Sequence, residues 1–392
     1  MSAGSGGAVI GIVAAIIAIA VARNTLTPTP SPSPSPTISG EDLVLTTLVV
    51  GTRESVTGGP DRTVWMTLLS WDQKEERGAV IYIPAHTATE IPGRGLQAVG
   101  EALTNGGVPL LLVATENLLG VTIDRYVELS DNDARVLFDE LGPISVDVPA
   151  EVRVRAGRRQ EQLIFVPGQQ QLPPSFIVRL LYTVGVDGDD VELGLRHLAF
   201  WDALLNSFEE DPGELAAAVE AAAPALSESD TSADEHGDLL RTLAETGSRA
   251  RTVTSLPVSQ ALPRTLVPGG GELYEADAEE IETFLTQTLG DIAIRETEIR
   301  VQILNGNGRP GIGQEVAKRL VGEGFRVLLS GNAKRLNYQR TLIVTYDSSP
   351  QGIALADRVK GLLGVGEVQV SRQEQGIVDV TIVVGRDFLR TL

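Results

Sequence analysis

Few side chains in this sequence could act as nucleophiles, metal ligands or general bases. Its 392 residues include no cysteine, which excludes disulfides, thiolate metal sites and cysteine nucleophiles. The only histidines are His86, His197 and His236, so few residues are available for a histidine metal site or a catalytic triad. Arginines and carboxylates remain as the candidates for chemistry that depends on charge.

A glycine-rich turn, Asn305 to Gly311, is a second candidate. A glycine turn before a helix can place backbone N–H groups around a phosphate. This turn lacks the Lys-Ser/Thr pair of a P-loop and the spacing of a dinucleotide-binding motif. We therefore interpret it as a tight turn between a strand and a helix.

The composition narrows the class of protein. A chain of this length predicts two or three domains, and 42 % apolar residues are enough for their cores. Aromatic residues make up only 4 %, so the cores must consist mainly of Val, Leu, Ile and Ala. With 32 basic and 52 acidic residues the net charge is −20, and there is no basic block. We expect no nucleic-acid partner.

The N-terminal segment predicts a membrane anchor followed by a spacer. Gly4 to Ala22 is apolar and uncharged, which fits one transmembrane helix within residues 1–23. A cleaved signal peptide is the alternative, because Ala20-Val21-Ala22 resembles a cleavage site. In residues 24–40, the run TPTPSPSPSPT predicts an extended polyproline-II linker.

The next stretch predicts a β-hairpin. Thr63 to Trp71 and Ala79 to Pro84 are β-branched and aromatic runs, and a charged turn separates them. Trp65 and Trp71 are six positions apart, and this even spacing places both on one face of their strand. We expect both in the core, with a lipid-lining role as the alternative.

Strands and helices alternate after the hairpin, which predicts an α/β sandwich. Two helices are expected at Gln97 to Asn105 and Pro109 to Leu119, separated by a stop at Gly106-Gly107. Ser130 is expected to cap the following helix. From residue 292 onward, the pattern predicts a second α/β domain with the order β-α-β-β-α-β-β.

Several separated motifs resemble those of the LytR-CpsA-Psr (LCP) family. They are the hairpin beginning RTVWMTLLSW, the run GGVPLLLVATENLLGVTIDRYVELS, and FDELGPISVDVP. VQILNGNGRPGIGQEVAKRLVGEGFRV, RTLIVTY and VTIVVGRDF likewise resemble a LytR C-terminal domain. The resemblance implies an LCP-like α/β/α sandwich with a mixed sheet at 41–291 and a smaller α/β domain at 292–392.

LCP proteins transfer wall polymers from polyprenyl-pyrophosphate carriers. The resemblance therefore implies a single-pass cell-membrane protein with an extracytoplasmic body. The implied partners are the membrane, a polyprenyl phosphate or pyrophosphate lipid, and a wall polymer or another envelope protein. The function implied is cell-envelope assembly.

The family's charged hairpin motifs are altered here. Its opening Arg-Ser/Thr-Asp-Thr motif falls on RTVW, so Arg62 is kept while Val64 replaces the aspartate. Its closing Pro-Arg-Asp motif falls on PAH, which puts Ala85 and His86 at the charged positions. A further family aspartate falls at Arg53.

Positions outside the hairpin are altered in the same way. The lysine and asparagine of the family's Lys-Ile-Asn motif fall near Ala98 and Gly100. The paired arginines before the family's last helix have no counterpart between Leu180 and Leu195.

The last helix keeps part of the family pattern. Asp190 matches an aspartate, whereas Leu193 stands in place of its arginine partner. Arg196 matches a further arginine, and His197 and Leu198 replace two glutamines.

We hypothesise a degenerate LCP domain that binds rather than transfers. The residual catalytic candidates are Arg62, Asp190 and Arg196, and the expected ligand-binding residues are Arg62, His86, Asp190 and His197. Mg²⁺ on Asp190 is implied only if the protein is active. The alternatives are an active LCP phosphotransferase and a non-catalytic structural scaffold. An Arg62–Asp190 ion pair at the rim of the sheet, and histidines that are merely polar fillers, are the structural alternatives for these residues.

Overall fold

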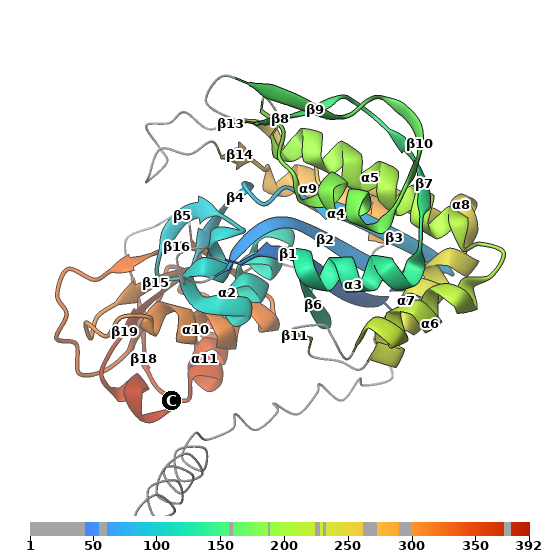
Figure 1. The fold of residues 1–392 in the computed structure, drawn as a ribbon. Helices are drawn as coiled ribbons and strands as arrows, with labels where there is room; N and C mark the ends of the chain where they lie inside the picture. Colours follow the sequence, from blue (N-terminus) through green and yellow to red (C-terminus); the bar gives the residue numbers. More distant parts are fainter. Residues whose placement is uncertain are drawn as a thin grey trace, which may run out of the picture. The chain divides into compact units, whose positions relative to one another are not determined.

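A six-stranded mixed sheet is the centre of the first part of the described chain (Figure 1). The computed structural model describes residues 44–54, 61–156, 160–186, 189–223, 228–229, 233–261, 273–289, 299–371 and 378–392. The predicted transmembrane segment (1–23) and linker (24–40) lie outside these ranges. Within them, no helix combines the length and apolar character needed to cross a membrane.

The sheet has the strand order β11-β6-β1-β2-β3-β12. β1 pairs antiparallel with β2 and parallel with β6, and β3 pairs antiparallel with β2 and parallel with β12. The strands span Val44–Arg53 (β1), Arg62–Asp72 (β2), Arg77–Ile83 (β3), Arg125–Ser130 (β6), Glu228–Ser229 (β11) and Arg251–Ser255 (β12). The predicted hairpin is confirmed as β2–β3, with Met66 opposite Ile83.

Both faces of the sheet are covered, which explains why its strands are almost continuously apolar. Successive side chains of a strand point to opposite faces. On β2, Trp65 and Leu69 belong to one buried cluster, whereas Met66 and Leu68 belong to the other. Both predicted core tryptophans contact the first cluster: Trp65 is buried in it, and Trp71 packs against it.

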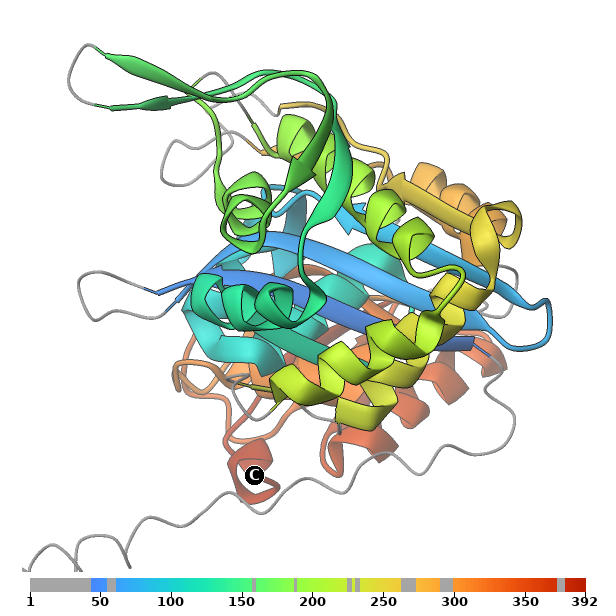
Figure 2. The same cartoon turned by 45° about the vertical axis from the view of Figure 1, so that its right-hand side comes forward.

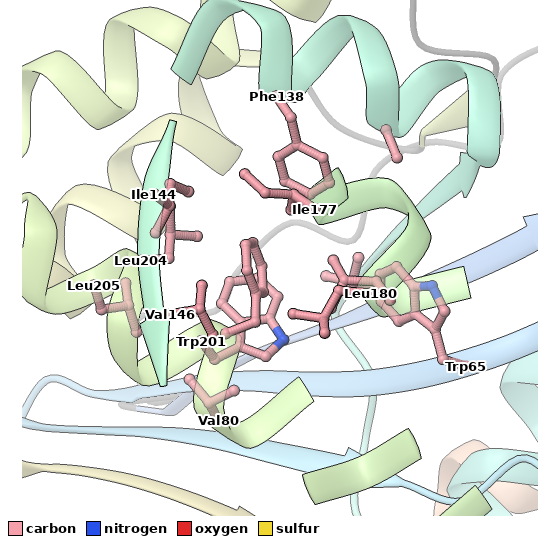
Figure 3. Close-up of a cluster of buried hydrophobic side chains, with 14 of the residues drawn as sticks. Trp65, Val80, Phe138, Ile144, Val146, Ile177, Leu180, Trp201, Leu204 and Leu205 are labelled. Atoms are coloured by element: carbon pink, nitrogen blue, oxygen red, sulfur yellow. The ribbon is translucent and has the colours of Figure 1, made fainter. Parts of the chain in front are cut away.

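The first cluster lies between the sheet and a layer of helices. In Figure 2 the green and yellow-green helices of this layer lie in front of the blue strands. Figure 3 shows Trp65 and Val80 of the sheet meeting Phe138, Ile177 and Trp201 of three helices. The layer contains helices Asp131–Leu141 (α3), Pro174–Tyr182 (α4), Asp190–Ser207 (α5), Pro212–Ala222 (α6) and Ala233–Glu245 (α7), with the short Gly247–Ala250 (α8) leading into β12.

The opposite face packs against two helices, Glu101–Leu119 (α2) and Ala278–Leu289 (α9). The predicted break between two helical segments before Leu119 is confirmed, because α2 consists of two helices joined at a kink. Gly106 and Gly107 do leave helical geometry, at φ −162° and +69°, so the predicted stop is a kink inside α2. Gln97 belongs to a strand instead of a helix.

Within the described ranges, eight further strands pair in four two-stranded ribbons. They pair Ala88–Ile91 (β4) with Gly95–Ala98 (β5), Ile144–Val148 (β7) with Gly168–Leu172 (β10), Val152–Arg155 (β8) with Glu161–Phe165 (β9), and Ser259–Ala261 (β13) with Tyr274–Glu275 (β14). Ser130 caps α3 as predicted, and Asp133 completes a reciprocal capping box.

A separate five-stranded sheet is formed by the C-terminal residues, in the order β16-β15-β19-β17-β18. Its elements are Ile299–Asn305 (β15), Ile312–Leu320 (α10), Val321–Glu323 (η3), Phe325–Asn332 (β16), Leu342–Thr345 (β17), Pro350–Leu363 (α11), Glu367–Val370 (β18), Val380–Val384 (β19) and Asp387–Arg390 (η4). The strand and helix order is the predicted β-α-β-β-α-β-β. Residues 290–298, which contain the predicted domain boundary, lie outside the described ranges.

Candidate functional site

A cavity of about 420 Å³ opens beside the β2–β3 hairpin. Polar and small residues line it: Arg62, Thr63, Ala85, His86, Ala98, Gly100, Glu101, Thr104 and Asn105. They come from the start of β2, the loop after β3, the end of β5 and the first turns of α2. The cavity therefore lies where four elements begin or end.

Hydrogen bonds hold these elements together at the cavity wall. The Thr63 hydroxyl donates to the Gly100 carbonyl at 3.0 Å, and the Gly100 N–H donates to the Ala85 carbonyl at 2.9 Å. The same short segment thus ties the start of β2 to the loop after β3. This explains how residues almost 40 positions apart come to line one cavity.

His86 and Asp190 form two short polar contacts at the site. The Asp190 Oδ2 accepts the backbone N–H of His86 at 2.7 Å and lies 2.8 Å from its ring Nδ1. Asp190 is 4 % exposed, whereas the His86 side chain is 58 % exposed at the cavity wall. The hydrogen bond to Asp190 raises the pKa of His86 above its ordinary value.

Close packing of α5 against the sheet places Asp190 within reach of His86. Asp190 is the first residue of α5, and the Asp189 carboxylate caps that helix by accepting the Glu192 N–H. One helical turn later, a Cβ on Gly194 would lie 2.8 Å from the Tyr82 ring. Glycine at this position therefore lets α5 approach β3.

Arg62 lies at the cavity with its side chain exposed. Within the described residues it forms no ion pair, and Asp190 is paired with His86. The predicted Arg62–Asp190 ion pair is therefore wrong. Arg62 brings to the cavity a guanidinium that no described carboxylate neutralises by direct contact.

His197 is placed in the core rather than at the cavity. Its ring lies between those of Trp65 and Tyr82, at centroid distances of 4.7 and 5.1 Å. Nε2 lies 3.1 Å from the Leu181 carbonyl oxygen, and because a carbonyl only accepts, this nitrogen carries the proton. Burial lowers the pKa of His197 to about 3, so the ring is neutral.

Arg196 is also buried in the core. Its guanidinium donates to the Leu180 carbonyl at 2.9 Å and to the Thr183 carbonyl at 2.7 Å. Burial lowers the pKa of this side chain. Neither Arg196 nor His197 lines the cavity. Of the predicted residues, Arg62 and His86 face it, and Asp190 supports His86 from behind.

The residues at this site do not fit a Mg²⁺ ion. The one carboxylate predicted as a ligand, Asp190, is buried, and its Oδ2 already accepts two hydrogen bonds from His86. Glu101 adds a single carboxylate at the cavity wall. Within the described ranges, no group of three or more His, Cys, Asp or Glu side chains is placed to hold a metal.

Five of the family positions identified in the sequence meet at this cavity. Arg62, Ala85, His86, Ala98 and Gly100 all line it, although three of the five carry no polar side chain. Sequence reasoning missed the residues that α2 contributes, Glu101, Thr104 and Asn105. Only the tertiary contact between α2 and the hairpin brings them to the site.

Two other family positions do not reach the cavity. Arg53 donates from its guanidinium to the Tyr182 carbonyl, which ties the end of β1 to the end of α4. Val64 packs against the first buried cluster. Both side chains have structural contacts in place of a role at the cavity.

A mixed α/β sandwich, its pocket at the mouth of a hairpin, and an attached five-stranded domain define the class of this protein. Residues 20–174 match the LytR_cpsA_psr family, and residues 298–388 match the family described as LytR cell envelope-related transcriptional attenuator. The chain belongs to the LCP family and carries a LytR C-terminal domain.

Two curated relatives are similar over part of their length. Both are named polyisoprenyl-teichoic acid–peptidoglycan teichoic acid transferase TagU. The protein from Halalkalibacterium halodurans is 34 % identical over 99 residues, which is 25 % of this chain and 32 % of the relative. The protein from Bacillus licheniformis is 28 % identical over 99 residues, 25 % of this chain and 31 % of the relative. The matched region thus spans about a third of each relative.

A solved structure supports the fold. The crystal structure of B. subtilis TagV superimposes with a TM-score of 0.52 at 20 % sequence identity. The superposition covers 63 % of this chain and 97 % of TagV. At this identity the likeness establishes the fold alone.

Proposed function

We propose that the cavity beside Arg62 and His86 binds the phosphate end of a polyisoprenyl-linked envelope polymer without catalysing ordinary metal-assisted transfer. The observation that carries this proposal is the composition of the cavity at the family's site. Among the described residues, it contains the unpaired Arg62 guanidinium, but Glu101 is the one carboxylate in its lining, because Asp190 is hydrogen-bonded to His86. The names of the curated relatives supply the ligand class, a polymer linked to a polyisoprenyl lipid.

The charges of the cavity favour an anion of modest charge. Arg62 offers a guanidinium with no ion pair among the described residues, and guanidinium groups pair well with phosphate oxygens. His86 adds a second positive charge when it is protonated, and Asp190 favours that state. Glu101, on the same wall, opposes an anion. Phosphate binding should therefore strengthen as pH falls and His86 gains its proton.

The same residues argue against phosphotransfer of the usual kind. Transfer of a phosphoryl group depends on several positive groups that stabilise developing charge. Ala85, Ala98 and Gly100 supply none at three family positions. Asp190 is committed to His86 and cannot also serve as a metal ligand in this arrangement.

We also propose that the protein is anchored by residues 1–23 and that its body is extracytoplasmic. The support is the uncharged apolar run in the sequence and the Pro-rich spacer that follows it. Protease accessibility of the body in intact cells tests this orientation.

The test of the binding function is a titration of the full chain, in detergent, with a polyprenyl phosphate. We expect Arg62→Gln to weaken binding at least about tenfold, because a hydrogen bond to a charged group contributes about 1.5–3 kcal/mol. Glu101→Gln should strengthen it. Arg179→Gln is the matched control, since Arg179 is an exposed arginine on α4 outside the cavity lining.

Two outcomes would favour the alternatives, an active transferase or a non-catalytic scaffold, over the proposed binding function. Release of phosphate from a lipid-linked polymer in the presence of Mg²⁺, lost in Arg62→Gln, would establish an active transferase. Absence of binding in both wild type and Glu101→Gln would favour the scaffold. Circular dichroism of each variant separates loss of binding from loss of folding.

A further inference from the structure

The C-terminal part of the chain differs in charge from the rest. Residues 292–392 contain 14 Lys and Arg against 10 Asp and Glu, although the whole chain has a net charge of −20. Residues 1–291 contain 18 Lys and Arg against 42 Asp and Glu, so the two parts of the chain have net charges of opposite sign.

Four of the Lys and Arg side chains of residues 292–392 line a cavity of about 530 Å³. It is lined by Gln339, Arg340, Lys360, Val365, Gly366, Glu367, Arg386, Asp387 and Arg390. The cations come from the segment before β17, the last turn of α11, and η4 with the residue before it. Val365 is the only large apolar residue in this lining.

Both carboxylates of the cavity are already engaged. The Asp387 carboxylate accepts the Thr341 N–H, the Thr341 hydroxyl and the Phe388 N–H, at 2.8–3.0 Å. The Glu367 carboxylate is paired with Arg340. These carboxylates therefore position the backbone and one arginine.

Three cations are left without such a partner. Lys360, Arg386 and Arg390 are exposed and form no ion pair within the described residues. Like charges this close together repel one another, and an anion between them would relieve that repulsion.

The backbone that carries these cations is fixed. The Arg386 N–H donates to the Tyr338 carbonyl at 3.0 Å, and the Asp387 N–H donates to the Gln339 carbonyl at 3.1 Å. A Cβ on Gly385 would lie 2.2 Å from the carbonyl carbon of Arg340, so the two segments approach as closely as glycine allows. A preorganised cavity loses little entropy when a ligand binds.

We propose that this cavity binds a phosphate group presented by a soluble polyanion. Arginine matches the geometry of phosphate oxygens, and three unpaired cations suit a group with more than one negative charge. A lipid surface is disfavoured, because membrane-binding faces combine cations with apolar side chains. The site is separate from the Arg62–His86 cavity and does not depend on the function proposed for it.

The test uses the full chain in detergent with two probes, inorganic phosphate and a short linear polyphosphate. Val365 methyl chemical shifts report binding at this cavity and not elsewhere. We expect both probes to shift the Val365 signals, with polyphosphate binding more tightly and both affinities falling as salt rises.

The variant Lys360→Gln/Arg386→Gln should weaken polyphosphate binding at least tenfold. The matched control is Lys334→Gln/Arg335→Gln, which removes the same charge from exposed residues of the same domain outside the cavity lining. Three results would overturn the proposal: no Val365 shift with either probe, equal loss of binding in the control, or a response only when phosphatidylglycerol is added to the detergent micelles.

Discussion

At the scale of single residues, three predicted site side chains have different environments. His86 is exposed and gains a proton more readily because Asp190 accepts its hydrogen bond. His197 is buried among aromatic rings and stays neutral. Arg196 remains buried because two carbonyl oxygens accept its hydrogen bonds. Only the first of these environments suits contact with a ligand.

Asp190→Asn should lower the pKa of His86. A histidine whose pKa is raised on folding stabilises the protein below its unfolded pKa near 6.5, and this stabilisation is lost as pH rises through the folded value. The variant should therefore lose stability at pH 5.5 and be less affected at pH 8. NMR titration measures the pKa of His86, and the midpoints of urea unfolding at both pH values measure the change in stability. Asp202→Asn, at an exposed position on the same helix, is the control, and an unchanged His86 pKa would contradict the prediction.

His197→Phe should flatten the dependence of stability on acid pH. Burial lowers the pKa of His197 to about 3, so unfolding takes up a proton below pH 6.5. Because of this residue, the free energy of unfolding of the wild type should fall by up to about 1.4 kcal/mol per pH unit as pH falls from 6.5 toward 3. Urea unfolding of the wild type and of His197→Phe at several pH values checks this. His86→Phe is the comparison of opposite sign, because it should remove stabilisation below pH 6.5. Parallel stability curves for the wild type and His197→Phe would refute it.

At the scale of elements, Arg196 joins α5 to the end of α4. Its two donated hydrogen bonds satisfy the carbonyls of Leu180 and Thr183, which stand at or just beyond the last turn of α4. The last carbonyls of a helix have no partner within the helix. Arg196 therefore acts as a C-terminal cap supplied by a neighbouring helix.

Arg196→Met should destabilise the protein by about 2–4 kcal/mol, because it leaves two carbonyl groups without their donors. Equilibrium unfolding in urea measures the loss. Arg179→Met removes an exposed arginine from α4 and should change stability by about 0.5 kcal/mol or less. If Arg196→Met weakened polyprenyl phosphate binding while stability was unchanged, Arg196 would have to be reassigned to the ligand site.

At the scale of the whole described body, residues 42–392 cluster as one compact unit. β16 is an edge strand of the C-terminal sheet, and edge strands present unpaired backbone groups. The Asn117 side chain of α2 donates to the Val327 carbonyl at 3.1 Å and accepts the Val327 N–H at 2.7 Å. The Glu90 carboxylate accepts the N–H and hydroxyl of Ser330 at 2.8 and 2.6 Å. Side chains of α2 and β4 thus cover part of this edge.

Asn117→Ala should destabilise the protein by about 1–3 kcal/mol, because both backbone groups of Val327 lose their partner in a buried contact. Hydrogen exchange of the Val327 amide should accelerate more than exchange in β15. Asn332→Ala, at an exposed position on the same strand, serves as the control. Equal protection of Val327 in Asn117→Ala and the wild type would show that the contact does not hold this edge.

Most of the architecture could be predicted from local patterns. The β2–β3 hairpin, the Ser130 cap and the succession of strands and helices along the C-terminal part follow from apolar periodicity and turn residues, which act over a few positions. The ribbons β8–β9 and β7–β10 were harder to predict. Only the last residue of β9 and of β10 is buried, so apolar alternation is weak there.

The sequence by itself determined the family and the mixed α/β class, because residue identity and local patterns decide these properties. The tertiary structure decided which remaining charges share one cavity. Arg62 and His86, at the two ends of a hairpin, line one cavity, while Asp190 reaches His86 from over 100 positions away. Arg196 and His197 follow Asp190 by less than two helical turns, yet both point into the core. The direction in which a side chain points from its helix, and whether it is buried, depend on packing between distant segments. No local sequence pattern encodes either property.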